Sequence, residues 1–280
     1  EENVGYQFLW HSGTVLPAWV TNLYGDEITI GGENYTVYDI DNPNVREMWE
    51  QIFEMLIPQI EDSNTTQLGY ILANEPHWFT DASASFNVTG ISQYTSAKFE
   101  AWLAETYGKV EALNTNWGTE YASFDDVDMQ VPTDLESLRG TPKYYDWCRF
   151  NMDRVNDWFQ FLHDGITEFD EDATTHIKIF PRIVVDENGQ RDHGIDIEYL
   201  TSLTEYNGND VTIRKRLPNA TSDEWWEENY IYDWRELAMT YAMLDSFNPD
   251  TLNVNSESHF LNGNASVSYT HLTLPTILRV

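Results

Sequence analysis

The chain has 280 residues, of which 41% are hydrophobic, so it is long enough for a barrel-sized domain with a substantial core. Acidic residues number 47 against 15 basic residues, and the net charge of −32 argues against nucleic acids and anionic membranes as partners, because phosphates are bound through Lys and Arg. No apolar run approaches the roughly 18 residues of a membrane span.

The expected elements alternate strands and helices along most of the chain. In chain order they are a strand at 4–10, a loop or small hairpin at 25–38, a helix from Pro43 capped by Asp41 or Asn42, a strand at 68–74, a helix at 92–107, a long helix at 143–169, a strand at 176–183, a short helix at 195–204, a weaker strand at 206–213, a helix at 231–246 and a strand at 251–256. This alternation predicts a parallel sheet with right-handed crossovers. It gives five strand–helix units.

The cysteine count, the first residues and the absence of binding motifs limit the compartment and the kind of protein that we expect. The single cysteine, Cys148, excludes a disulfide framework and a cysteine-based metal site, and it suits both a reducing compartment and many exported bacterial enzymes. The localisation therefore stays open between cytoplasm and export. The chain begins with Glu1 and enters a strand-like run almost at once, so we expect an internal part of a larger gene product. No metal-binding, nucleotide-binding or phosphate-binding motif is present, so we expect no cofactor. Whether the full-length protein is a homo-oligomer is left open.

Two predicted strands end in a glutamate. Glu75 follows the run 68–74, and Glu257 follows the run 252–256. In α/β barrels the catalytic residues lie at the C-terminal ends of the strands. Two such carboxyl groups about 5 Å apart, one acid and one nucleophile, are what retaining glycoside hydrolysis requires. The stretch of sequence between Glu75 and Glu257 leaves room for three strand–helix units. It therefore predicts that the two glutamates lie on strands four and seven of an eightfold barrel and face each other across its mouth. For each glutamate the alternative is a structural loop acid in a salt bridge.

Further side chains near strand ends are candidates for sugar contacts, each with a structural role as the alternative. The candidates are His11, His77 and His259 as hydroxyl donors, Trp10 and Trp78 as flat stacking faces, and Asp210 as a hydrogen-bonding acid. Tryptophans on helix stripes are expected in the core instead; they are Trp49, Trp102, Trp147 and Trp158. Trp117 is expected to pin its loop.

The amino-acid sequence of several segments resembles that of glycoside hydrolase family 42, the β-galactosidase family of the large retaining (β/α)8 clan. The resemblance covers about residues 4–262 and rests on Val15-Leu16-Pro17-Ala18-Trp19, Ala73-Asn74-Glu75, Phe99-Glu100-Ala101-Trp102-Leu103, Trp117-Gly118-Thr119 and Asp146-Trp147-Cys148-Arg149-Phe150. The family usually has Asp-Asn-Glu-Tyr/Phe-Gly where this chain has Ala-Asn-Glu-Pro-His, which leaves the exact sugar open.

The resemblance implies an incomplete TIM (β/α)8 barrel that carries about strands three to seven. It implies Glu75 as general acid/base, Glu257 as nucleophile and Asn74 as the partner of the sugar 2-hydroxyl. The expected activity is retaining hydrolysis of β-galactosidic linkages in a carbohydrate substrate. The alternatives are an agarase- or porphyranase-like endo-hydrolase of galactans, a non-catalytic carbohydrate-binding relative, and an inactive fragment.

The expected domain is residues 1–266, a partial barrel with a long insertion at about 76–142. The last fourteen residues, 267–280, contain no acid in an otherwise acid-rich chain. They resemble a translated sequencing-adapter tail, and we expect a non-native tail; an ordinary final strand is the alternative.

Overall fold

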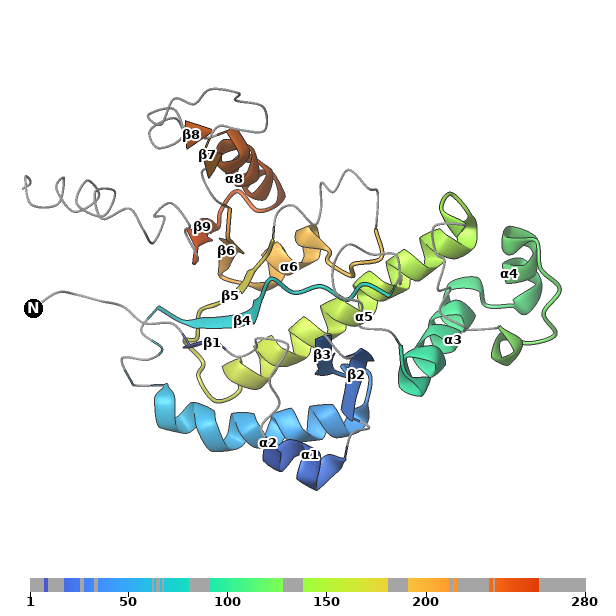
Figure 1. The fold of residues 1–280 in the computed structure, drawn as a ribbon, viewed down its shortest axis with the longest axis horizontal. Coiled ribbons are helices and arrows are strands. Elements are labelled where there is room, and N and C mark those ends of the chain that lie inside the picture. Colours follow the sequence, from blue (N-terminus) through green and yellow to red (C-terminus); the bar gives the residue numbers. More distant parts are fainter. Residues whose placement is uncertain are drawn as a thin grey trace, which may run out of the picture.

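The structure is a computed structural model that describes residues 8–9, 18–25, 28–32, 35–61, 63, 66, 68–80, 91–127, 138–180, 191–211, 214–215, 232–233 and 235–256. Its elements in chain order are β1 (Phe8–Leu9), α1 (Ala18–Tyr24), β2 (Thr29–Gly32), β3 (Tyr35–Tyr38), α2 (Pro43–Ile60), β4 (Tyr70–Asn74), α3 (Gln93–Tyr107), α4 (Val110–Trp117), η3 (Phe124–Asp126), α5 (Pro142–Thr167), β5 (Thr175–Lys178), α6 (Ile197–Leu203), β6 (Tyr206–Asn209), β7 (Arg214–Lys215), β8 (Tyr232–Asp233), α8 (Arg235–Phe247) and β9 (Leu252–Asn255) (Figure 1).

Five parallel strands follow one another in chain order across the molecule. β1 pairs with β4, and β4 pairs with β5. A parallel bridge between Ile179 and Asn209 joins the end of β5 to β6, which pairs in turn with β9. Since all five strands are parallel, their C-terminal ends lie at the same edge of the sheet. The parallel sheet predicted from the strand–helix alternation is therefore confirmed for these five strands, while β2–β3 and β7–β8 form separate antiparallel pairs.

A glycine allows β5 and β6 to approach closely. A β-carbon added at Gly208 would clash with the ring of His176 and with the backbone of Ile177. Any larger residue at this position would push β6 away from β5. Gly208 therefore lets β6 lie beside β5, where Ile179 and Asn209 form the parallel bridge.

Helices α2 and α5 lie on the same side of β4 and bury their apolar stripes against the sheet and each other (Figure 1). Asn42 caps α2 by accepting a hydrogen bond from the backbone nitrogen of Asn44, and Pro43 occupies the first turn. Thr141 caps α5 in the same way. The buried side chains of α2 are Val45, Met48, Trp49, Phe53 and Ile57. Each side chain of this kind contributes about 1.5–3 kcal/mol when it is fully buried.

Asp41, one of the two residues predicted to cap α2, has a different role. Its Oδ2 atom lies 2.7 Å from Nη1 of Arg154 on α5, and both side chains are buried. Its Oδ1 atom lies 3.2 Å from Nζ of Lys98 on α3. The cap is Asn42, and Asp41 holds the start of α2 against two other helices.

The segment between β4 and α5 builds a second, smaller core beyond the N-terminal half of α5 (Figure 1). The helix predicted at 92–107 is present as α3, and Ser92 caps it with a capping box. One buried acid on α5 holds this segment: Oδ2 of Asp146 accepts hydrogen bonds from the Tyr107 hydroxyl at 2.5 Å and the Trp117 indole at 2.7 Å. Trp117 pins its segment, as predicted.

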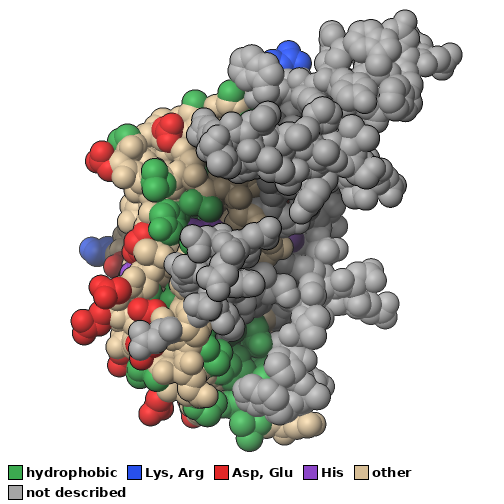
Figure 2. Space-filling model, turned by 90° about the vertical axis from the view of Figure 1, so that its left-hand side faces the viewer, with side chains coloured by type: hydrophobic (Ala, Val, Ile, Leu, Met, Phe, Trp, Pro, Cys, Tyr) green, Lys and Arg blue, Asp and Glu red, His purple; other side chains and the backbone are tan. Residues whose placement is uncertain are grey.

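The four helix-stripe tryptophans expected in the core do lie in or against the two cores. Trp49 and Trp158 belong to the main core, while Trp147 lies in the smaller core with Trp102 packed against it. Acidic side chains are spread over the described surface, and few basic side chains are visible between them in the view of Figure 2. No helix in the described part of the chain is long and apolar enough to cross a membrane.

Candidate active site

Glu75 lies directly after β4, at the edge where the parallel strands end. Its backbone nitrogen still donates to the carbonyl of Lys178 at 2.9 Å, so the residue is held to the neighbouring strand. Its φ of 48° lies in the left-handed region, the only such non-glycine residue among those the structure describes. A glutamate in that conformation carries backbone strain, which is found most often at functional positions.

Lys178 and Asp210 bring two further ionisable groups to Glu75. Lys178 is the last residue of β5; its side chain is only 2% exposed, and its Nζ atom lies 3.2 Å from Oε1 of Glu75. Asp210 follows β6, is 7% exposed, and lies within hydrogen-bonding reach of Glu75. Burial, followed by the hydrogen bond and charge of Glu75, raises the pKa of Asp210 to about 7, although Lys178 opposes the shift.

Asn74 and His77 are two further described candidates at this edge. Asn74 ends β4 and is paired in register with Lys178. The Nδ1 atom of His77 lies 3.0 Å from the backbone oxygen of Glu75. Burial lowers the pKa of His77, and the neighbouring Glu75 only partly offsets that effect, so the ring is neutral at neutral pH.

Trp78 is placed as a core residue. It is 4% exposed and packs edge-on against Phe159, with ring centroids 5.9 Å apart. A sugar-stacking face must be open to substrate, so this burial does not favour the predicted sugar contact of Trp78.

Four of the candidate residues lie outside the described residues: Trp10, His11, Glu257 and His259. The described chain ends at Ser256, one residue before Glu257. β9 is the neighbour of β6, and the backbone nitrogen of Ser256 donates to the Asn209 carbonyl at 3.2 Å. Glu257 is the next residue in the sequence.

Lys178 is the buried partner of Glu75 that the sequence pattern did not single out. Its available signal was a lysine inside the strand predicted at 176–183, between Ile177 and Ile179, in a chain with only 15 basic residues. A buried lysine needs a carboxylate partner, but nothing local in the sequence indicates that Glu75 is that partner.

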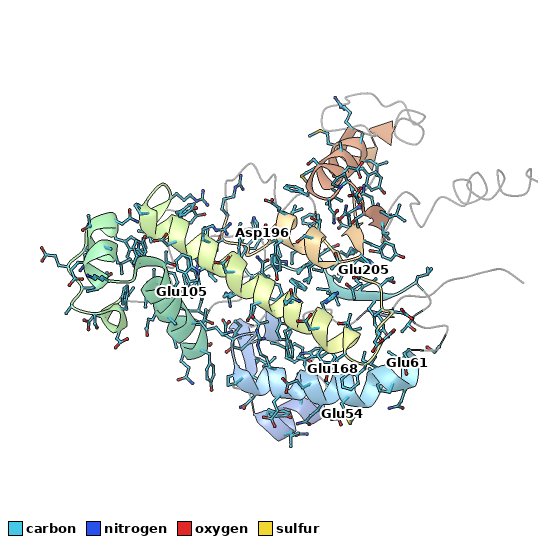
Figure 3. The ribbon with its side chains drawn as sticks, turned by 180° about the vertical axis from the view of Figure 1, so that it is seen from behind. Glu54, Glu61, Glu105, Glu168, Asp196 and Glu205 are labelled. Atoms are coloured by element: carbon cyan, nitrogen blue, oxygen red, sulfur yellow. The ribbon has the colours of Figure 1, made fainter. Side chains whose placement is uncertain are left out.

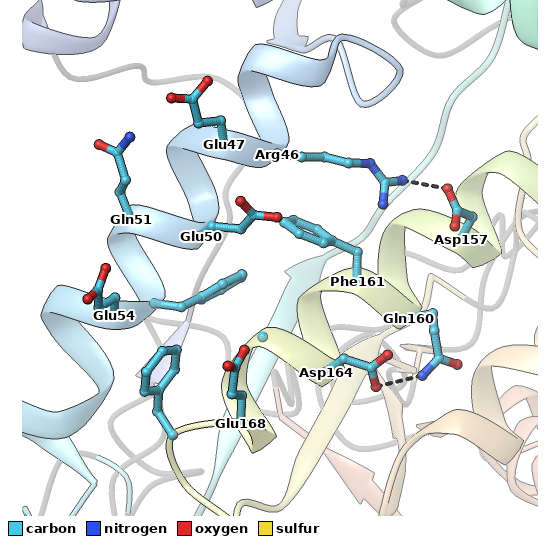
Figure 4. A pocket seen from close by; sticks show the side chains of 13 residues that line it. Arg46, Glu47, Glu50, Gln51, Glu54, Asp157, Gln160, Phe161, Asp164 and Glu168 are labelled. Atoms are coloured by element: carbon cyan, nitrogen blue, oxygen red, sulfur yellow. Dashed lines mark hydrogen bonds and ion pairs between the residues drawn. The ribbon is translucent and has the colours of Figure 1, made fainter.

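The groove shown in Figure 4 is a separate feature. It has a volume of about 890 Å³ and is lined only by residues of α2, of α5 and of the segment after α5. Glu54 and Glu168 line opposite sides of it, and both are also labelled in Figure 3. It includes no residue from the C-terminal ends of the strands, so it is not the catalytic site expected for this fold. Among the described side chains, no group of three or more His, Cys, Asp or Glu could hold a metal ion.

Comparisons with known proteins agree with this architecture. The β-galactosidase profile of glycoside hydrolase family 42 matches residues 15–230. The apo exo-carrageenase of that family from Bacteroides ovatus is 35% identical, with a TM-score of 0.77, over 94% of this chain and 35% of that one. The cold-adapted β-galactosidase from Rahnella sp. R3 is 16% identical, with a TM-score of 0.65, over 91% of this chain and 35% of that one.

A curated relative, the β-galactosidase Bga of Halorubrum lacusprofundi, is 34% identical over 79 residues, which are 26% of this chain and 11% of that protein. The chain thus spans about a tenth of this relative and about a third of the two solved structures. The structural similarity gives the chain a TIM-barrel fold. Because the profile match covers most of its length, the chain belongs to the β-galactosidase family, glycoside hydrolase family 42.

Proposed function

We propose that the protein containing this chain hydrolyses β-galactosidic linkages with retention of configuration, using Glu75 as general acid/base and Glu257 as nucleophile. The observation that carries the proposal is the position of Glu75. It lies at the C-terminal edge of the parallel sheet, strained in its backbone and in contact with two buried ionisable groups, in a member of a glycosidase family. Glu257 lies C-terminal to the matched residues, so its role rests on its sequence position, two residues after the end of β9.

The chemistry has two steps. In the first, the Glu257 carboxylate attacks the anomeric carbon, the glycosidic C–O bond breaks, and Glu75 gives its proton to the leaving oxygen. In the second, water attacks the glycosyl ester, Glu75 takes the proton of the water, and the Glu257 carboxylate is released. These two reaction steps require carboxyl groups about 5 Å apart, and we expect that separation between Glu75 and Glu257.

Asn74 and His77 are the described candidates for substrate contacts. Asn74, beside Glu75, is expected to hydrogen-bond the sugar 2-hydroxyl. His77 is expected to bond a sugar hydroxyl as a neutral ring, because burial lowers its pKa. Trp10, His11 and His259 remain proposed contacts, whereas Asp210 is proposed to act on Glu75, to which it is hydrogen-bonded, instead of on the sugar.

The architecture proposed for the chain is about strands three to seven of the barrel. In this assignment β1, β4, β5, β6 and β9 are those five strands, within a domain of residues 1–266. The segment at about 76–142 is the insertion, which supplies α3, α4 and η3. Residues 267–280 are proposed to be a non-native tail.

A second candidate substrate is a sulfated galactan. It is favoured by one observation: the structural relative that is 35% identical over 94% of this chain is an exo-carrageenase. The net charge of −32 disfavours a polyanionic substrate unless a local basic patch binds it. Turnover of an aryl β-galactoside should be compared with turnover of carrageenan oligosaccharides. Hydrolysis of only the sulfated oligosaccharides would replace the first candidate by the second.

The roles of the two glutamates can be tested in the complete gene product. Glu75→Ala should still glycosylate the enzyme when the leaving group is an activated phenol, because that step then needs no proton. Azide should restore turnover and give the β-glycosyl azide, since it replaces water in the second step. Glu257→Ala should instead give the α-glycosyl azide, because azide attacks the opposite face directly.

With an unactivated substrate, Glu75→Ala and Glu257→Ala should each lower kcat by about 100-fold or more. A factor of this size is typical for the loss of proton transfer, and the loss of a nucleophile costs more. Glu205→Gln is a suitable control because its carboxylate lies at the N-terminal end of β6, where it bonds Thr175. The same azide anomer from both glutamate variants would contradict the proposed roles.

A further inference from the structure

Three ionisable side chains meet at the ends of three adjacent strands. Lys178 Nζ, on β5, lies 3.2 Å from Oε1 of Glu75, which follows β4. Asp210, which follows β6, reaches Glu75 within hydrogen-bonding distance. Asp210 and Lys178 are both buried. Two ionised carboxylates in direct contact repel each other, and one ammonium compensates only one of them. The arrangement therefore favours a carboxyl pair that holds one proton.

We propose that Asp210 and Lys178 are positioning residues that act through Glu75: Asp210 shares one proton with Glu75, and Lys178 balances the carboxylate that is left ionised. The proposal rests on the assignment of Glu75 as acid/base catalyst made above. Neither residue needs to touch the substrate, because their effect is on the protonation of Glu75.

The arrangement suits a residue that must hold a proton in one step and lack it in the next. Before the first step, the pair holds one proton and Glu257 is ionised. In that step the pair passes its proton to the leaving oxygen while the Glu257 carboxylate becomes a neutral ester. The summed charge of the pair, Lys178 and Glu257 is therefore unchanged. In the second step, water returns a proton to the pair and the Glu257 carboxylate forms again.

The other ionisable groups near the pair add no compensating charge. His77, in the segment after β4, contacts the backbone of Glu75, and burial lowers its pKa. His176, two residues before Lys178 on β5, is fully buried, and burial lowers its pKa to about 4. Both rings are neutral near pH 7. Of the described side chains that act on Asp210, Lys178 is the only cation. The raised pKa of Asp210, at about 7, agrees with one shared proton near neutral pH.

The test uses the alkaline limb of kcat/KM in the complete gene product, with a galactoside that has a poor leaving group. This limb reports the loss of the acid proton in the free enzyme. Asp210→Asn removes a negative charge that strengthens proton binding at Glu75 while Lys178 remains. The limb should move to lower pH by about one unit or more. Lys178→Met removes the opposing cation, so the limb should move to higher pH.

Two comparisons separate this effect from damage to the fold. With a dinitrophenyl galactoside, the first step needs no proton from Glu75. The alkaline limb of kcat/KM for this substrate should therefore not shift in Asp210→Asn or in Lys178→Met. Glu205, labelled in Figure 3, lies at the opposite end of β6 and accepts a hydrogen bond from the backbone nitrogen of Thr175. Glu205→Gln removes this carboxylate's charge and should leave the limb in place. An unmoved limb in both Asp210→Asn and Lys178→Met, or movement in the same direction, would overturn the proposal.

A failure of the proposed function would look different. The unmodified enzyme would then lack an alkaline limb that depends on the leaving group, or Glu75→Ala would keep that limb. If a variant does not fold, carboxyl ¹³C NMR of the unmodified enzyme decides the question. The Glu75 and Asp210 carboxyl carbons should both sense the same two titration steps. Two independent single-step curves would overturn the shared proton.

Discussion

At the scale of single residues, one buried carboxylate ties three helices together. Asp41 precedes α2 and contacts Arg154 of α5 at 2.7 Å and Lys98 of α3 at 3.2 Å. Burial by itself would raise the pKa of Asp41, but the two cations outweigh burial and hold the pKa below its ordinary value. Removing one partner of such a buried pair leaves an uncompensated charge, which typically costs about 3–5 kcal/mol.

Asp41→Asn should therefore destabilise the complete gene product by about 3–5 kcal/mol, which thermal unfolding between pH 3 and 7 would measure. Because the folded pKa is lowered, the difference from the unmodified protein should be full above about pH 4, the ordinary pKa of an unfolded aspartate. It should disappear as the pH falls through the lower folded value. The matched control is Asp157→Asn on α5, whose side chain is 59% exposed, and it should cost less than about 1 kcal/mol. Equal losses in the two variants would contradict the buried-pair explanation.

At the scale of elements, Asp146 attaches the insertion to α5. It accepts hydrogen bonds from Tyr107 at the end of α3 and from Trp117 at the end of α4. Asp146→Ala leaves both donors without this acceptor, so α3 and α4 each lose one hydrogen bond to α5. Hydrogen exchange in each of the two helices should therefore increase by about tenfold, while α2 stays protected. Glu105→Ala, an exposed change on α3 (Figure 3), should not alter exchange in α4. Faster exchange throughout the molecule would mean that Asp146 supports the whole domain instead.

At the scale of the whole molecule, the described sheet has two unpaired sides. β1 and β9 each pair with one described strand, and Leu252 of β9 is 71% exposed. Open edges and exposed apolar side chains promote association between chains. Residues 1–280 expressed alone should therefore aggregate and be nearly inactive, which light scattering and an aryl galactoside assay would measure. The complete gene product is the control. A monomeric 280-residue chain that melts cooperatively and hydrolyses the galactoside would contradict the proposed incomplete barrel.

The elements that could be predicted from the sequence are those with a strong local pattern. The apolar stripes of α2 and α5 specify their helices without reference to the rest of the chain. Helix α1, at 7 residues, and helix α4, at 8, were not predicted. Such short helices are marginal alone and depend on packing against the rest of the fold. Length is not the whole reason, because α6 has only 7 residues and lies within the helix predicted at 195–204.

The sequence by itself determined the family, the parallel order of the strands and the position of Glu75 at a strand end. These features depend on contiguous residues: the family on short sequence motifs, and the strands and helices on apolar residues that recur with a fixed period. Only the tertiary structure decided the partners of Glu75, because Lys178 lies 103 residues away in the chain and meets it through the pairing of β4 with β5. It likewise placed Trp78 in the core and Asp41 in an ion pair. Burial and charge pairing depend on which distant segments come together, and the pairing and packing of the elements set that arrangement.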